Sequence, residues 1–406
     1  MVALGGLLFG FDTGVISGAL LFLKEDLALD SFEEGAVVST LLIGAAAGAL
    51  LSGRPADRWG RKPVLVAVAA TFTIGLLLAA LATGFWMLIA ARTVLGLAVG
   101  AASAVVPLYL SEIAPPRLRG RLVTANQVLL TTGILVSYLI NLGFSGTANW
   151  RAMFAVGLVP SVAMLLGTLT IPESPARRRP PAPRPPGAGA GTRRMLLARS
   201  ARPALVIGVT LGAVQQFGGI NSVIYYAPSL FHRAGLTAGN SITYSVVIGA
   251  VNVAATALSV PLIDRLGRRP LLLLSLAGML VSLVPLGFAL AAGGSGGAVV
   301  AVVCMVAYVA AFAVGLGPVF WILICELFPP EARARGAGVC AVVNWAANFA
   351  VGQMFLPVAD LTGDGAVFWF FAAVSLAAIV FVHRTVPETK NRSFEEIQQD
   401  LLPVRA

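Results

Sequence analysis

The chain has 406 residues, of which 58% are hydrophobic and only 11% are charged, and its formal net charge at pH 7 is +10. Soluble globular proteins carry about 25% charged residues, so this composition and the mean hydropathy of +0.88 exclude a soluble globular protein. They indicate a polytopic membrane protein.

About twelve apolar runs are long enough to cross a bilayer, which takes roughly 17 to 25 residues in a helix. They cover residues 2–23, 34–53, 63–83, 86–113, 122–144, 150–171, 203–231, 241–263, 270–292, 298–323, 337–358 and 367–382. Because lipid offers no hydrogen bonds to the backbone, each span is predicted to be an α-helix. We therefore expect an all-α membrane protein.

Lysine and arginine residues concentrate in alternate loops. Arg54, Arg58 and Arg61 follow the second span, and further arginines crowd the region 177–202 after the sixth. This asymmetry is the positive-inside pattern, and it predicts cytoplasmic termini in a multi-pass protein of the plasma membrane. The net positive charge is then a topology signal. The expected surroundings are the lipid bilayer, with no nucleic acid, and we expect a monomer.

The region 176–202 interrupts the series of spans. It is rich in proline, glycine and arginine and lacks apolar periodicity, which is typical of an extended linker. The predicted organisation is an N-terminal six-helix half (1–175), a cytoplasmic linker (176–202), a C-terminal six-helix half (203–386) and a cytoplasmic tail (387–406).

The two halves repeat one another in sequence. GRPADRWGRK (53–62), after the second span, recurs as VPLIDRLGRR (260–269) after the eighth, and PESP (172–175) after the sixth recurs as PETK (387–390) after the twelfth. Parallel six-span repeats place a transporter's substrate site near the membrane midplane, between the halves.

At these residues the sequence resembles the major facilitator superfamily and, within it, the sugar porter family. The loop D-R-x-G-R-[RK] is typical of the superfamily, while PESP, PETK and QQFGGIN (215–221) narrow the resemblance to sugar porters. The resemblance covers nearly the whole chain. It implies the twelve-helix major facilitator fold and transport of a monosaccharide (a hexose or pentose) or a polyol by alternating access.

Charges of both signs lie at the same membrane depth in both halves. Such charges pair when the cytoplasmic side is closed and separate when it opens, which describes a gate. The alternative is that they only fix orientation and cap helices, which we favour for Arg58, Lys62, Arg265 and Arg269. The predicted gate residues are Asp57, Arg61, Glu112, Arg119, Asp264, Arg268, Glu326 and Arg333, to which the resemblance adds Glu173 and Glu388.

Polar side chains inside the spans mark the predicted substrate site. Gln215 and Gln216 lie beside a Gly-Gly break in the seventh span, where two amides are costly unless they face a polar cavity. Amides donate to and accept from hydroxyl groups without adding charge, and aromatic rings offer flat apolar faces. The predicted substrate-binding residues are Phe9, Gln127, Gln215, Gln216, Asn221, Tyr225, Asn252, Trp321, Asn344 and Trp345.

The resemblance supports most of this set. It implies a sugar pocket at Gln127, Gln215, Gln216, Asn221, Asn252, Trp321 and Trp345. Asn344 departs from the pattern, because many relatives carry glutamine there, so the size or stereochemistry of the preferred sugar stays open. The alternative for an isolated amide is an interhelical hydrogen bond worth about 0.6 kcal/mol. For Asn348 and Tyr226 both interpretations stay open.

Asp12 lies in the first half of the first span, and Arg92 lies near the start of the fourth. An ionisable group in hydrocarbon costs roughly 2.5 to 3.5 kcal/mol on insertion scales, so we expect the two to meet. A change in their separation would change the proton affinity of the carboxyl group. The resemblance implies proton coupling, because symporters of the family carry this pair whereas uniporters commonly carry asparagine at the first position. The alternative is a static ion pair, which apolar packing could replace at little cost.

The sequence therefore predicts a symporter of a monosaccharide or polyol with the proton as coupling ion. The alternatives are a uniporter and a non-transporting sugar receptor or degenerate paralogue, since the segment before the first span and the region after PESP are shorter than in relatives. An enzyme is not expected, because neither His232 nor His383 belongs to a metal-ligand cluster or nucleophile triad. No cofactor or metal is predicted.

Overall fold

The structure is a computed structural model that describes residues 2–113, 119–174, 202–292, 294–328, 333–392 and 394–401. Within these ranges 12 helices are long and apolar enough to cross a membrane, some of them interrupted by a short break. The prediction of an all-α polytopic membrane protein is confirmed. The predicted linker 176–202 lies outside the described residues, apart from Arg202.

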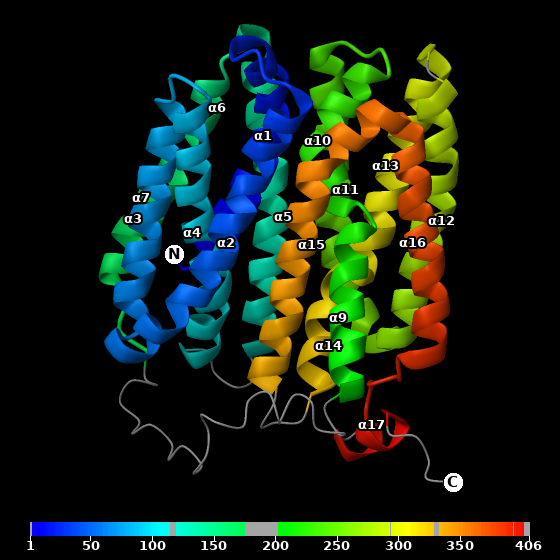
Figure 1. Ribbon diagram of the computed structural model, residues 1–406. Helices are drawn as coiled ribbons and strands as arrows, with labels where there is room; N and C mark the ends of the chain where they lie inside the picture. Colours follow the sequence, from blue (N-terminus) through cyan, green and yellow to red (C-terminus); the bar gives the residue numbers. More distant parts are fainter. Residues whose placement is uncertain are drawn as a thin grey trace.

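The helices run roughly parallel to one another (Figure 1). The first six spans are α1 (Leu4–Asp26), α2 (Ser31–Trp59), α3 (Arg61–Ala80), α4 (Phe85–Ile113), α5 (Arg119–Phe144) and α6 (Trp150–Val156) with α7 (Leu158–Thr170). The last six are α9 (Arg202–Phe217) with α10 (Ile220–Arg233), α11 (Ala238–Leu266), α12 (Arg268–Ala292), α13 (Gly294–Val314) with α14 (Leu316–Glu326), α15 (Arg333–Thr362) and α16 (Asp364–Thr385). The short helix α17 (Phe394–Leu401) follows.

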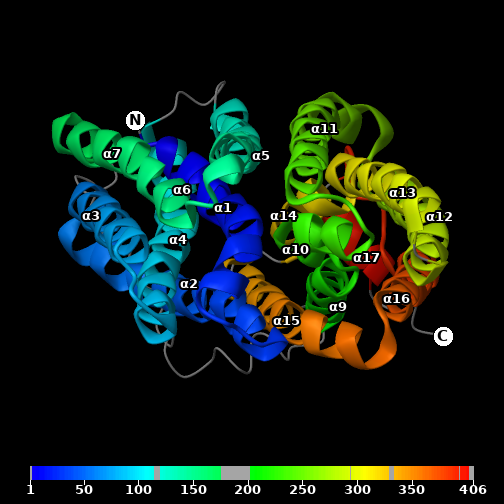
Figure 2. The same ribbon diagram turned by 90° about the horizontal axis from the view of Figure 1, so that it is seen from above.

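Seen along the helices, α1 to α7 lie on one side and α9 to α16 on the other, as Figure 2 shows. The two groups touch where α2 meets α15, α5 meets α11 and α1 meets α10. We call the end of the bundle that carries Gly60 and Gly267 the basic end, which is at the bottom of Figure 1, and the end that carries residues 27–30 and 234–237 the opposite end.

Glycine residues interrupt three of the spans. The predicted break at Gly218 and Gly219 is present between α9 and α10, and Gly219 has a φ of +91°, a conformation that side chains with a Cβ rarely adopt. Breaks at Gly157 and Gly315 were not predicted. A Cβ at Gly315 would lie 2.6 Å from the carbonyl oxygen of Leu271, so the kink there allows close packing on α12.

The first span is continuous and packs tightly on α5. A Cβ built on Gly10 would lie 1.8 Å from the carbonyl oxygen of Leu130, and one on Gly14 would lie 2.1 Å from Ser137 Oγ. Small residues let helix backbones approach in this way inside membranes. The backbone of α1 is therefore held against its own half on either side of Asp12.

Candidate functional site

A buried ion pair joins the first and fourth spans. Arg92 Nη1 lies 2.8 Å from Asp12 Oδ1, and each residue is only 1% exposed. Arg92 also donates through Nε to the carbonyl oxygen of Val37 at 3.0 Å, which ties α2 to the same centre. The predicted contact between Asp12 and Arg92 is therefore present.

The second carboxylate oxygen of Asp12 is unpaired. Oδ2 is buried and accepts no hydrogen bond from the part of the chain that the structure describes. A buried acceptor without a donor costs free energy. Adding a proton to Oδ2 would remove the charge of the carboxylate without displacing the Arg92 hydrogen bond to Oδ1, so the pair has a position at which a proton can be taken up.

Four of the predicted substrate-binding amides form one hydrogen-bonded chain. Asn344 donates through Nδ2 to Gln215 Oε1 at 2.7 Å and accepts from Gln216 Nε2 at 3.1 Å. Asn221 Nδ2 donates to Gln216 Oε1 at 2.7 Å. The chain links α9, α10 and α15, and it lies at the Gly218 and Gly219 break, where sequence reasoning located it.

Gln215 extends this chain to a second helix break. Its Nε2 donates to the carbonyl oxygens of Leu316 and Gly317, each at 3.1 Å. Both carbonyls belong to the first turn of α14, directly after the kink at Gly315. The amide chain therefore connects the two interrupted spans of the C-terminal half.

The aromatic residues of the predicted site are arranged less tightly. Phe9 and Trp345 lie with ring centroids 6.0 Å apart, so they touch across the two halves. Trp321 is 40% exposed, and its ring packs against Phe320. Tyr225 is buried and packs edge to face on Tyr226.

Gln127 and Asn252 are not tied into the amide chain. Neither side chain makes a hydrogen bond to the described residues, although Asn252 is buried. The structure thus brings Gln215, Gln216, Asn221 and Asn344 together, and Phe9 with Trp345, but joins Gln127 and Asn252 to neither group through polar contacts. Both amides keep their hydrogen-bonding capacity.

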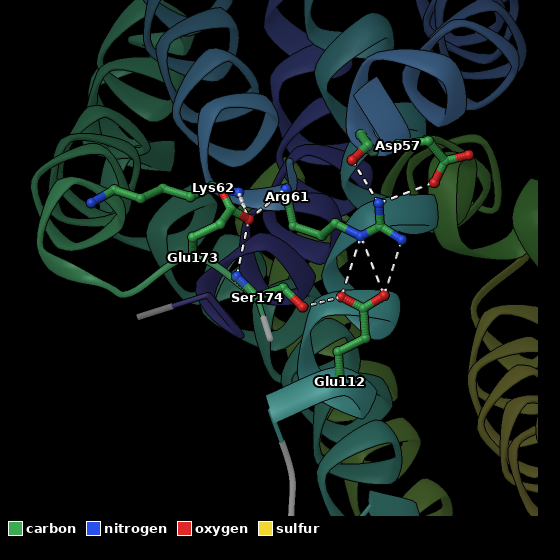
Figure 3. Close-up of polar contacts among 7 residues, drawn as sticks. Asp57, Arg61, Lys62, Glu112, Glu173 and Ser174 are labelled. Atoms are coloured by element: carbon green, nitrogen blue, oxygen red, sulfur yellow. Dashed lines mark hydrogen bonds and ion pairs between the residues drawn. The ribbon is translucent and has the colours of Figure 1, made fainter. Parts of the chain in front are cut away.

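The N-terminal half holds a charge cluster at the basic end, drawn in Figure 3. Arg61, at the start of α3, contacts Glu112 Oε1 through Nη2 and Asp57 Oδ1 through Nη1, both at 3.0 Å. Glu173 Oε1 accepts from the backbone N–H groups of Arg61 and Lys62 at 2.8 and 3.2 Å. A carboxylate here satisfies the free N–H groups of the helix and is favoured by the helix dipole.

Gly60 makes the approach of Glu173 possible. Its φ is +102°, and a Cβ built there would lie 2.5 Å from Glu173 Oε2. The neighbouring Ser174 donates through Oγ to Glu112, so the segment after the sixth span is tied to the end of the fourth (Figure 3).

The C-terminal half repeats this cluster. Arg268 Nη2 lies 2.9 Å from Glu326 Oε1, and its Nη1 lies 4.0 Å from Asp264. Glu388 accepts from the backbone N–H groups of Arg268 and Arg269 at 2.9 and 3.1 Å. As in the first half, the glycine before the helix, here Gly267, has a positive φ of +94°, and Thr389 Oγ1 donates to Glu326 at 2.6 Å.

The surroundings of Glu388 lower the pKa of its carboxyl group. Burial of its carboxyl group favours the neutral form, but backbone N–H groups of Lys390, Arg268, Arg269 and Thr389 outweigh burial and lower the pKa of Glu388 below its ordinary value. Hydrogen bonds to the charged form have this effect. The carboxylate is therefore held in its ionised state at neutral pH.

The two central arginines pair with carboxylates of their own half. In the described residues, the ion pairs of Arg61 stay within the N-terminal half and those of Arg268 within the C-terminal half. The side chains of the other predicted gate arginines, Arg119 and Arg333, lie outside the described residues. Sequence reasoning missed Ser174 and Thr389, although each follows the repeated glutamate directly, which was the available signal.

The halves do contact one another at the opposite end. Ser31 of α2 hydrogen-bonds to Asp360 of α15, which also accepts from Arg233 of α10 at 2.8 Å. Deeper in the bundle, Ser39 of α2 donates to Gln353 of α15 at 2.6 Å. Sequence reasoning missed Gln353, although an amide inside a span is the same signal that revealed Gln215.

Comparison with known proteins places this geometry in a family. Residues 1–176 and 188–401 match the sequence model described as "Sugar (and other) transporter". The chain is 37% identical to a D-xylose transporter of Levilactobacillus brevis, over 98% of this chain and 94% of the relative. It is 36% identical to a galactose-proton symporter of Escherichia coli strain K12, over 100% and 94%.

Solved structures agree with these relatives. The crystal structure of a D-xylose-proton symporter matches with a TM-score of 0.86 at 31% identity, covering 97% of this chain and 98% of that one. An inward open conformation of a xylose transporter from Escherichia coli matches with a TM-score of 0.83 at 30% identity, covering 98% of each chain. The chain therefore belongs to the sugar transporter family.

Proposed function

We propose that this protein is a secondary active transporter that carries a monosaccharide or polyol together with a proton by alternating access. The observation that carries the proposal is the buried Asp12–Arg92 pair, whose second carboxylate oxygen is unpaired. Relatives at 36–37% identity are named as a D-xylose transporter and as proton symporters for galactose and arabinose. These names support a sugar as the substrate class.

The proton step follows from the surroundings of Asp12. At low effective dielectric the attraction between the two charges is strong, so α1 and α4 are held together while Asp12 is ionised. A proton on Oδ2 neutralises the carboxylate and weakens that attraction. Arg92 keeps its hydrogen bond to the Val37 carbonyl, so α4 stays joined to α2 when the attraction between α1 and α4 weakens.

The substrate step belongs to the amide chain. Neutral amides can exchange their mutual hydrogen bonds for bonds to sugar hydroxyls, at little net cost because donors and acceptors balance. Gln127 and Asn252 add unpaired polar groups, and the rings of Phe9, Trp345 and Trp321 suit the apolar face of a sugar ring. Asn344 is one methylene shorter than glutamine and is bound to both glutamines of the chain, so the substrate panel has to vary the size and stereochemistry of the sugar.

The positive-inside pattern supports a cytoplasmic location for the basic end and for both termini in the plasma membrane. With that orientation, the contacts between Ser31 and Asp360 and between Ser39 and Gln353 close the outer side. In the part of the chain that the structure describes, neither Arg61 nor Arg268 forms an ion pair with the other half, in keeping with a site that opens to the cytoplasm. Exchange of partners between the two clusters would close it.

Uptake into proteoliposomes tests the proposal and its alternatives. A labelled pentose and hexose panel is offered with an acidic exterior, with and without a protonophore. Symport predicts accumulation that the protonophore abolishes. Equilibration without accumulation would favour a uniporter, and binding without uptake would favour a receptor.

A further inference from the structure

Gln353 bridges the two halves from within the membrane-spanning part of α15. It lies about two and a half turns from the outer end of that helix and is only 6% exposed. Its Oε1 accepts from Ser39 Oγ at 2.6 Å, and its Nε2 donates to the carbonyl oxygen of Phe32 at 3.0 Å. Both partners belong to α2, so one amide uses an acceptor and a donor to hold the opposite half.

The backbones of α2 and α15 meet at the same depth. A Cβ built on Gly35 would lie 2.6 Å from the carbonyl oxygen of Gln353. The contact leaves no room for water between the helices at this point. The hydrogen bond between Gln353 and Ser39 is buried and is therefore made in a low-dielectric setting, where an unpaired amide is costly.

A second buried side chain makes the same kind of bridge elsewhere. Tyr138 of α5 is 0% exposed, and its hydroxyl donates to the carbonyl oxygen of Ile224 in α10 at 2.8 Å. It too lies in the outer half of the membrane, since α5 ends at Phe144. Tyr138 and Gln353 come from different halves and contact different helices.

We infer that Gln353 and Tyr138 form a two-point clamp that holds the outer side of this protein closed and sets the fraction of molecules open to the outside. The inference rests on the proposed alternating-access function. Opening the outer side must break three hydrogen bonds, of which those to Ser39 and Ile224 are buried and that to Phe32 is partly buried. No member of the clamp is charged, which distinguishes it from the outer contact of Ser31 with Asp360 and Arg233.

The clamp has a consequence for transport. A substrate that arrives from outside binds only the outward-open fraction, and its apparent affinity is reduced by that fraction. A weaker clamp should therefore lower the half-saturation concentration for external sugar. Neither clamp residue hydrogen-bonds to the amide chain, so the change would come from the conformational equilibrium.

The test measures the outer distance between the halves. Spin labels are placed at Thr147→Cys and Thr362→Cys, two exposed positions at the opposite end, after Cys304, Cys325 and Cys340 have been replaced by alanine. Distance distributions are recorded in lipid nanodiscs without sugar or a pH gradient. Because no transport is needed, failure of the proposed function and failure of the clamp give different results.

Tyr138→Phe and Gln353→Leu remove the polar bridges between the halves, and Tyr138→Phe also removes a contact of the hydroxyl with Ser17 in its own half. A buried hydrogen bond contributes about 1 kcal/mol, so Tyr138→Phe, which removes one bond, should raise the ratio of long-distance to short-distance molecules roughly fivefold. Gln353→Leu, which removes two bonds, should raise that ratio by up to about 30-fold, and the double variant by roughly the product. Tyr308→Phe is the matched control, since its hydroxyl donates to the Gly218 carbonyl at 2.7 Å within one half. It should leave the distribution unchanged.

Ser39→Ala is a second test of the same bridge in case Gln353→Leu does not fold. It removes the hydrogen bond from Ser39 to Gln353 with only a small change in side-chain volume. An unchanged distribution in Tyr138→Phe and Ser39→Ala would overturn the clamp. An equal shift in Tyr308→Phe would also overturn it, since the effect would then be a general loosening. Half-saturation for external sugar should fall in the same variants in proportion to the long-distance population.

Discussion

The two halves repeat one another in sequence but carry different buried polar groups. The N-terminal half carries the ion pair of Asp12 and Arg92 on continuous helices, and α1 is pressed against α5 through Gly10 and Gly14. The C-terminal half carries the amide chain on two interrupted spans, broken at Gly219 and Gly315. The buried ion pair lies on continuous helices, and the amide chain lies beside two helix breaks.

The difference has a physical reason. A buried charge tolerates little movement, because its stabilisation depends on a short, fixed distance to its partner. Amides can exchange partners at small cost, so they suit helices that change shape when substrate binds. A repeat that began as two equal halves could therefore place proton coupling and substrate recognition in different halves.

Among the substitutions that test this difference between the halves, Asp12→Asn should have the largest effect on transport. It removes the proton site from the N-terminal half, and we expect proton-driven accumulation to fall to equilibration while exchange of labelled for unlabelled sugar continues. Asp26→Asn is the matched control. Asp26 lies on the same helix as Asp12, but it is exposed, and it pairs with Arg151 of α6 at 3.0 Å. Accumulation that survives in Asp12→Asn would make the buried pair structural.

Gln215→Ala should have the next largest effect. It removes one acceptor of Asn344 and the side-chain donor to the first-turn carbonyls of α14, and we expect sugar affinity to fall about tenfold or more, as measured by calorimetry. Asn141→Ala is the control from the other half, because this buried amide donates to the Gly14 carbonyl at 3.2 Å. Equal losses of affinity in both variants would show that the amides are not divided between the halves.

Gly219→Ala tests whether the break in the seventh span is needed. Alanine at a φ of +91° costs about 1 to 2 kcal/mol, and its Cβ would lie 2.2 Å from Phe371. The melting temperature and the transport rate should both fall. Gly218→Ala should be milder, since its Cβ meets the flexible end of Met279. A transport rate that is unaffected by Gly219→Ala would mean that the C-terminal half does not need this hinge.

Glu388→Gln and Glu173→Gln should have similar, smaller effects, because both glutamates bind the N-terminus of a helix. We expect a loss of about 1 kcal/mol at pH 7. The pKa of Glu388 is lower in the folded state, so its stabilisation is present above its unfolded pKa and is lost as pH falls through the folded value. Thermal melts of wild type and Glu388→Gln should therefore converge in acid. A gap that persists there would contradict the assignment.

Much of this structure was predictable from hydrophobicity and repeats. Span positions follow from apolar length, and the Gly218 and Gly219 break follows from two residues without favourable helix propensity. The contact between Asp12 and Arg92 was predictable because each is too costly alone in lipid. The kink at Gly315 was not, since a single glycine in an apolar run is common and its reason is the close approach to Leu271, which depends on tertiary packing.

The candidate site was predictable in its residue types and less so in its connections. Gln215, Gln216, Asn221 and Asn344 were all identified, but no spacing rule shows that Asn344 stands between the two glutamines. Gln353 and Tyr138 escaped notice because their importance depends on which helices of the opposite half they face. Which side chains meet across the two halves depends on how the halves pack together, and local sequence patterns do not encode that packing.

The charge clusters around Arg61 and Arg268 at the basic end also bear on how transport depends on ionic strength. In the described residues, Arg61 and Arg268 are neutralised by carboxylates of their own half, so separating the inner ends of the two halves breaks none of the observed ion pairs. Screening by salt acts mainly on exposed charges that attract over a distance. Opening of the inner side should therefore depend little on ionic strength, whereas the return of the empty carrier, in which the inner ends approach and the clusters exchange partners, should slow as ionic strength rises.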